Sequence, residues 1–130
     1  MTATNAILLI AHGSRRAEAN ADLNHLAEQI RQRGRYAIVE TAYLELAEPD
    51  IETGGVRCVE RGASQVTLLP YFLSPGVHVR EDLIEARETL SKRFPEVAFR
   101  VAEPLGRHPL LIDIVEQRAQ ECEAVEPAHS

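Results

Sequence analysis

Residues 7–15 read ILLIAHGSR, a run of five apolar residues that ends directly at His12. The run shows no polar alternation. Such a run is typical of a strand buried on both faces, as found in parallel sheets covered by helices. A histidine that follows such a strand lies at the carboxyl edge of the sheet, where open α/β proteins bind their ligands. The stretch therefore predicts an α/β fold with a site near His12.

Strand-like and helix-like segments alternate along the rest of the chain. Strands are expected at residues 7–11, 36–44, 65–72 and 97–102, and helices at residues 17–33, 51–61, 80–94 and 109–122. Gly34 fits the residue that ends the first helix. Gly54 and Gly55 lie inside the second helix and predict an irregular first turn, because each costs about 1 kcal/mol relative to alanine.

This order of segments predicts a three-layer α/β sandwich, in which a four-stranded parallel sheet has helices on both faces. Right-handed crossovers leave few topologies, and we expect the flavodoxin-like strand order 2-1-3-4. The crevice of that topology opens at the carboxyl ends of strands 1 and 3. The length of 130 residues indicates one domain, expected over residues 1–122, followed by a mobile polar tail at residues 123–130.

Two more residues with metal-binding side chains follow strands in the same way. His78 comes after the third expected strand and Glu45 after the second, so the strand order brings both to one rim with His12. Two imidazoles and a carboxylate are a common ligand set for divalent transition metals, and they accept protons near neutral pH. The sequence leaves open that the histidines are structural, hydrogen-bonded residues and that Glu45 is a solvated loop acid.

Positive charge lies close to histidines in a chain whose net charge is −6. The arginines concerned are Arg15, Arg16, Arg80 and Arg107. Backbone N–H groups of Gly13 and Ser14, ahead of the first expected helix, form a natural anion site that the neighbouring arginines would strengthen. The alternative is that these arginines only face solvent. His108 either borders the pocket or caps the last helix.

Several classes of protein are excluded by composition. The acidic net charge argues against general nucleic-acid binding. No apolar stretch approaches the length of a membrane span, and residues 1–5 carry no basic side chain, so we expect a cytoplasmic protein without a signal peptide or membrane contact. Cys58 and Cys122 lie far apart without C-x-x-C spacing, which argues against a disulfide framework and a zinc ribbon.

Taken together, these motifs resemble the short-form sirohydrochlorin chelatases, the small members of the class II chelatase family. The similarity spans roughly residues 6–115. The stretches that carry it are LIAHGSR at 9–15, LELAEP at 44–49, GA at 62–63, PYFL at 70–73, GVHVRED at 76–82 and PLGRHP at 104–109. Gly54 and Gly55 depart from the regular helix usual there.

The resemblance implies an enzyme that inserts a divalent metal into the tetrapyrrole sirohydrochlorin, for cobalamin or sirohaem biosynthesis. The metal, Co²⁺ or Fe²⁺ or in some members Ni²⁺, is a substrate, and no organic cofactor is implied. The family likeness also implies a homodimer. His12 and His78 carry over as the pair that handles the metal and accepts protons, and Glu45 matches the acidic position after the second strand.

Side chains near the predicted rim are candidates for binding this substrate. Arginines pair with its carboxylates, and apolar side chains form a wall for the ring. The candidates are Ser14, Arg15, Arg16, Arg80 and Arg107 for the carboxylates, and Tyr43, Tyr71, Phe72 and Leu73 for the ring. Two other functions stay open on sequence alone: a non-catalytic metal or tetrapyrrole carrier, and a phosphate-ester enzyme that uses His12 and the arginines after it.

Overall fold

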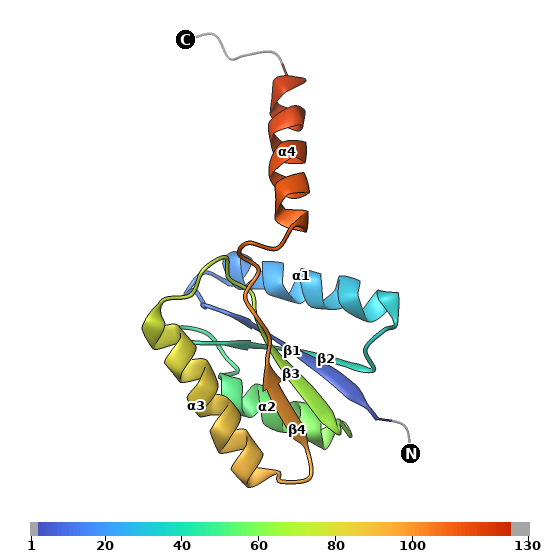
Figure 1. The fold of residues 1–130 in the computed structure, drawn as a ribbon, viewed down its shortest axis with the longest axis vertical. Helices are drawn as coiled ribbons and strands as arrows, with labels where there is room; N and C mark the ends of the chain where they lie inside the picture. Colours follow the sequence, from blue (N-terminus) through green and yellow to red (C-terminus); the bar gives the residue numbers. More distant parts are fainter. Residues whose placement is uncertain (1–2, 126–130) are drawn as a thin grey trace.

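A parallel four-stranded sheet lies at the centre of the computed structural model, which describes residues 3–125 (Figure 1). The elements in chain order are β1 (Asn5–Ala11), α1 (Ala17–Arg33), β2 (Ile38–Tyr43), α2 (Ile51–Glu60), β3 (Gln65–Pro70), α3 (Val77–Arg93), β4 (Ala98–Val101) and α4 (Leu110–Glu123). The strand order is β2-β1-β3-β4, and every neighbouring pair is parallel. The predicted fold class and strand order are therefore confirmed.

Alternating side chains of β1 build a separate core on each face of the sheet. Leu8 and Ile10 pack into the larger core under α2 and α3, while Ile7 and Leu9 pack into the smaller core under α1. Strand β1 pairs with β2 on one side and with β3 on the other. Its continuous apolar run follows from this position, because both faces and both edges are covered.

The bounds of α1 and the start of α3 bear on the site. Helix α1 has the predicted bounds, and Gly34 ends it in the left-handed conformation with φ of 75°. Helix α3 begins at Val77, three residues earlier than predicted, because the chain leaves extended geometry directly after Gly76. His78 therefore lies in the first turn of a helix and not in the loop after a strand.

The glycine pair inside α2 does not make the helix irregular, so that prediction was wrong. Helix α2 is regular from Ile51 to Glu60, and both glycines are buried. A Cβ on Gly54 would lie 2.8 Å from Leu8 Cδ1, and one on Gly55 would lie 2.5 Å from Leu90 Cδ1. The missing side chains let α2 approach β1 and α3 closely, which offsets the low helix propensity of glycine.

Helix α4 projects away from the layers (Figure 1), and none of its residues is buried. Within one copy, the prediction of helices on both faces therefore holds through α1 on one face and α2 and α3 on the other. Glu123, which begins the predicted tail, belongs to α4, while residues 126–130 of that tail lie outside the described residues.

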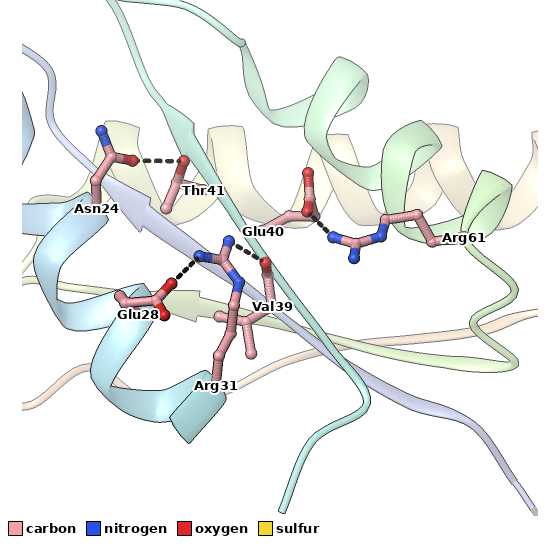
Figure 2. A network of polar contacts seen from close by, with 7 residues as sticks. All are labelled: Asn24, Glu28, Arg31, Val39, Glu40, Thr41 and Arg61. Carbon is pink, nitrogen blue, oxygen red and sulfur yellow. Dashed lines mark hydrogen bonds and ion pairs between the residues drawn. The ribbon is translucent and has the colours of Figure 1, made fainter. Parts of the chain in front are cut away.

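Polar side chains fasten the edge strand β2 from both faces of the sheet (Figure 2). On the α1 side, Arg31 donates to the Val39 carbonyl at 2.7 Å, and the Thr41 hydroxyl donates to Asn24 at 3.3 Å. On the other side, an ion pair of 2.6 Å joins Glu40 to Arg61, which directly follows α2. These contacts hold in place the strand that leads to Glu45.

Both cysteines are free, with Cys58 buried and Cys122 exposed on α4. None of the helices within residues 3–125 has the length and apolar character needed to cross a membrane.

We expect Gly54→Ala to lower the free energy of unfolding by about 1–3 kcal/mol, because the added methyl group is forced against buried Leu8 and Ala42. Urea denaturation measures the change. Gly76→Ala is the matched control, since its Cβ would meet nothing within 4 Å, and its effect should be only the small loss of a glycine N-cap of α3, below about 1 kcal/mol. Equal effects of the two changes would contradict the packing role of Gly54.

Candidate active site

Backbone hydrogen bonds carry the pairing of β1 and β2 beyond the strand ends and bring His12 beside Glu45. The N–H of Leu44 donates to the Ala11 carbonyl at 3.0 Å, and the N–H of Glu45 donates to the His12 carbonyl at 3.1 Å. The side chains then meet, with His12 Nε2 3.0 Å from Glu45 Oε1. Both side chains are more than half exposed, at 60% and 58%, so the pair faces solvent and any bound ligand.

Gly13 makes this approach of the two loops possible. Its φ of 102° lies in the left-handed region that side chains rarely adopt. A Cβ at this position would also clash with the carbonyl oxygen of Glu45. The HGS sequence thus requires glycine for both its backbone conformation and its contact with the opposite loop.

Asn20 holds the loop after His12, a role that sequence reasoning missed. Its Oδ1 accepts from the N–H of Ser14 at 3.0 Å, and its Nδ2 donates to the Ser14 carbonyl at 2.8 Å. The Ser14 hydroxyl accepts from the N–H of Arg16 at 3.0 Å. Of the two N–H groups in the predicted anion site, that of Ser14 is therefore already bonded to Asn20. An asparagine six residues after the serine was the available signal.

Tyr43 does not belong to the ring-binding wall, and that prediction was wrong. Its side chain is 3% exposed and packs in the core under α1, because the last residue of β2 points to that face. The Tyr43 hydroxyl donates to the Asn20 carbonyl at 3.0 Å, and burial raises the pKa of this hydroxyl. Tyr43 therefore supports the loop after His12 through its hydrogen bond to Asn20.

Exposed apolar side chains lie on the loops at this edge of the sheet. The ring of Phe72 meets the His12 ring edge-on, with centroids 6.3 Å apart. Tyr71 and Leu73, on the same connection between β3 and α3, are exposed at 42% and 64%. Leu46, next to Glu45, is 51% exposed and has φ of 62°. Sequence reasoning missed Leu46, since no local pattern marks a leucine that a turn presents to solvent.

His78 is not brought together with His12 and Glu45. Its side chain is 97% exposed in the first turn of α3, and its Nδ1 lies 3.9 Å from Glu81. Among residues 3–125, no three His, Cys, Asp or Glu side chains are grouped closely enough to hold a metal ion. Of the three predicted metal ligands, His12 and Glu45 are thus in contact, and His78 lies apart from them.

Arg80, Arg107 and Leu73 line one cleft of about 810 Å³. Leu73 and Gly106 belong to loops in close contact, since a Cβ on Gly106 would clash with the Leu73 carbonyl. His108 fits both predicted alternatives, because it lines the cleft and its Nδ1 accepts from the first N–H of α4 at 3.1 Å. Arg15 and Arg16 are exposed and do not line this cleft.

Comparison with known proteins gives one consistent result. The family model described as CbiX matches residues 6–122. The chloroplastic sirohydrochlorin ferrochelatase of Arabidopsis thaliana is 38% identical over 118 residues, which cover 91% of this chain and 52% of that protein. The sirohydrochlorin cobaltochelatase of Sulfolobus acidocaldarius is 29% identical, over 92% of this chain and 94% of that protein.

Solved structures agree with these matches. The sirohydrochlorin chelatase SirB of Bacillus subtilis subspecies spizizenii, in complex with cobalt, has a TM-score of 0.81 at 29% identity and aligns over 91% of this chain and 50% of its own. A CbiX protein of Marinobacter aquaeolei VT8 has a TM-score of 0.77 at 34% identity, over 93% and 99%. The chain thus spans about half the length of the Arabidopsis relative and nearly all of the Marinobacter one.

Asn20→Ala should lower the free energy of unfolding by about 1–3 kcal/mol, because two hydrogen bonds to Ser14 are lost. It should also speed amide hydrogen exchange at Ser14, measured by NMR. Asn24→Ala, one turn further along α1, removes one longer, exposed bond to Thr41 and is the control. Unchanged exchange at Ser14 in the Asn20 variant would refute the role assigned to this residue.

Proposed function

The chain belongs to the CbiX family, and on that premise we propose that it inserts a divalent metal into sirohydrochlorin. The observation that carries the proposal is the contact of 3.0 Å between His12 and Glu45 at the carboxyl edge of the sheet. The relatives are named as sirohydrochlorin ferrochelatases and cobaltochelatases, so the metal we propose is Co²⁺ or Fe²⁺, as a substrate.

The chemistry requires groups that bind a cation and also accept protons. Metal insertion removes two pyrrole N–H protons from the ring and delivers a dication to the ring nitrogens. In our proposal, His12 and Glu45 hold the metal weakly, accept these protons and pass them to water, which their exposure permits. A site with two or three protein ligands suits transfer of the metal better than a closed structural site.

His78 is part of the proposal as a third, mobile ligand. It follows β3, which pairs with β1 on the side opposite β2, so it approaches the same edge of the sheet. Its side chain is almost fully exposed, so it can turn toward an incoming metal or ring without breaking packing.

Substrate binding divides between an apolar surface and positive charges. We assign the flat ring to Leu46, Tyr71, Phe72 and Leu73. Its carboxylates pair with Arg80 and Arg107 in the cleft, and with Arg15 and Arg16 at the other rim. A single lobe offers only a shallow surface to so large a ligand, so the proposed active form is a homodimer. The two free cysteines agree with the proposed cytoplasmic location, a reducing compartment.

An assay with sirohydrochlorin and Co²⁺, or with Fe²⁺ under anaerobic conditions, tests the activity. The ring absorption should change faster than in the spontaneous reaction, with many products formed per subunit. No acceleration with Co²⁺, Fe²⁺ or Ni²⁺ would contradict the proposal. Stoichiometric binding without turnover would instead indicate a carrier.

His12→Ala should lower kcat by about 10²- to 10⁴-fold, because the main proton acceptor is lost. Glu45→Gln should lower it as well, since the amide neither accepts the proton nor balances the metal's charge. Steady-state kinetics measure both effects. The control is His25→Ala, an exposed histidine on α1, which should keep the wild-type rate. A wild-type rate in the His12 variant would contradict the assignment of His12 as the main proton acceptor.

A further inference from the structure

A second cleft adjoins the one that Arg80 and Arg107 line. It lies where α3 packs against β4 (Figure 1), and its volume is about 240 Å³. Arg80, Glu103 and Pro104 line both clefts, so the two are contiguous. None of the proposed metal ligands lines this α3–β4 groove, and the function proposed above gives the groove no role.

The walls of the α3–β4 groove are mainly apolar. Leu83 and Ile84 of α3 form one side, and residues at the ends of β3 and β4, Pro70 and Val101, form the other. Ile84 is 44% exposed, so part of this apolar surface is open to a ligand. The walls suit a short aliphatic arm better than a fully hydrated ion.

Arg87 gives the groove a positive charge that has no partner. Its side chain is half-buried, and it pairs with no carboxylate within residues 3–125. Helix α3 offers it none, because the positions three and four residues away hold Leu83, Ile84, Leu90 and Ser91. Partial burial of an unpaired charge costs free energy, which a bound carboxylate would recover.

Arg80 extends this positive charge into the first cleft. It lies seven residues before Arg87, two turns or about 10.5 Å along α3, so both arginines lie on the same side of the helix. It also has no ion pair in the described part of the chain. Together with Arg107, three arginines but only one carboxylate, Glu103, line the joined clefts of a chain whose net charge is −6. This arrangement favours a ligand that carries several carboxylates.

We propose that the α3–β4 groove is a further carboxylate subsite for the tetrapyrrole, and that Arg87 makes the protein selective for rings with many carboxylate arms. The proposal rests on the proposed function and names the feature of the substrate that the groove recognises. Sirohydrochlorin carries an acetate and a propionate arm on each of its pyrrole-derived rings. Arg80 and Arg107 pair with carboxylates in the first cleft, and Arg87 pairs with the carboxylate of an arm that enters the groove.

Selectivity follows from the number of arginines. A ring with carboxylates all round its edge can give each of the three arginines a partner of its own. A ring that bears only two carboxylates leaves at least one arginine without its own partner. Arg87 should therefore contribute to the binding of carboxylate-rich rings and contribute little to the binding of others.

Binding of metal-free porphyrins to the full chain, followed by quenching of porphyrin fluorescence, tests the subsite. Uroporphyrin III carries the same acetate and propionate arms as sirohydrochlorin, whereas deuteroporphyrin carries only two propionates. Arg87→Gln should weaken the binding of uroporphyrin III by about 5- to 30-fold, as expected for the loss of one charge-assisted hydrogen bond in a half-exposed site. The same change should leave the binding of deuteroporphyrin nearly unchanged.

Two further variants serve as controls. Lys92→Gln removes the same charge from the same helix at an exposed position outside both clefts, and it should bind both porphyrins like the wild type. Arg87→Lys keeps the charge and the aliphatic stem but loses the planar fork, so its affinity for uroporphyrin III should lie between those of the wild type and Arg87→Gln. It also replaces Arg87→Gln in the test if circular dichroism shows that the glutamine variant does not fold.

Three results would overturn the proposal. They are wild-type affinity for uroporphyrin III in the Arg87 variants, equal weakening of both porphyrins, and equal weakening by Lys92→Gln. Calorimetry with glutarate separates an arm of the ring from a small free dicarboxylate. We expect no measurable binding of millimolar glutarate, and glutarate binding that Arg87→Gln abolishes would contradict the assignment of the groove to the ring.

The metal-insertion assay keeps this proposal apart from the proposed function. Arg87→Gln should raise KM for sirohydrochlorin with little change in kcat, because the groove includes neither His12 nor Glu45. A wild type that binds the porphyrins as expected but inserts no metal refutes the proposed function alone. An active wild type whose KM is unaffected by Arg87→Gln refutes the subsite alone.

Discussion

The two hydrogen bonds that extend the β1–β2 pairing beyond the strands are the constraint on which the site depends. They set His12 opposite Glu45, and they require Gly13, whose backbone conformation and missing side chain let the loops touch. Strand β1 is buried on both faces and paired on both edges, so the exposed pair stands at the end of the central strand. Asn20 then fixes the loop that follows.

Much of this arrangement follows from sequence patterns. A strand covered on both faces needs a continuous apolar run, so residues 7–11 predict a central parallel strand correctly. Helical spacing and Gly34 predict the bounds of α1. The meeting of His12 with Glu45 follows from the strand order, because parallel neighbours end at the same edge.

Other features depend on three-dimensional packing that no local pattern contains. Tyr43 is buried because of the face to which the last residue of β2 points. Gly54 and Gly55 are explained only by how closely Leu8 and Leu90 approach. The direction of His78 depends on a helix that starts earlier than its sequence indicates. Likewise, the sequence of α4 predicts a helix but does not indicate that it projects away from its own sheet.

A crystal structure of the protein soaked with Co²⁺, with the metal located by its anomalous scattering, tests most directly whether the sheet edge handles the metal. We expect one Co²⁺ ion about 2 Å from His12 Nε2, with the Glu45 carboxylate beside it as ligand or proton acceptor. A Co²⁺ ion bound at full occupancy by ligands that include neither His12 nor Glu45 would contradict the assignment of this pair.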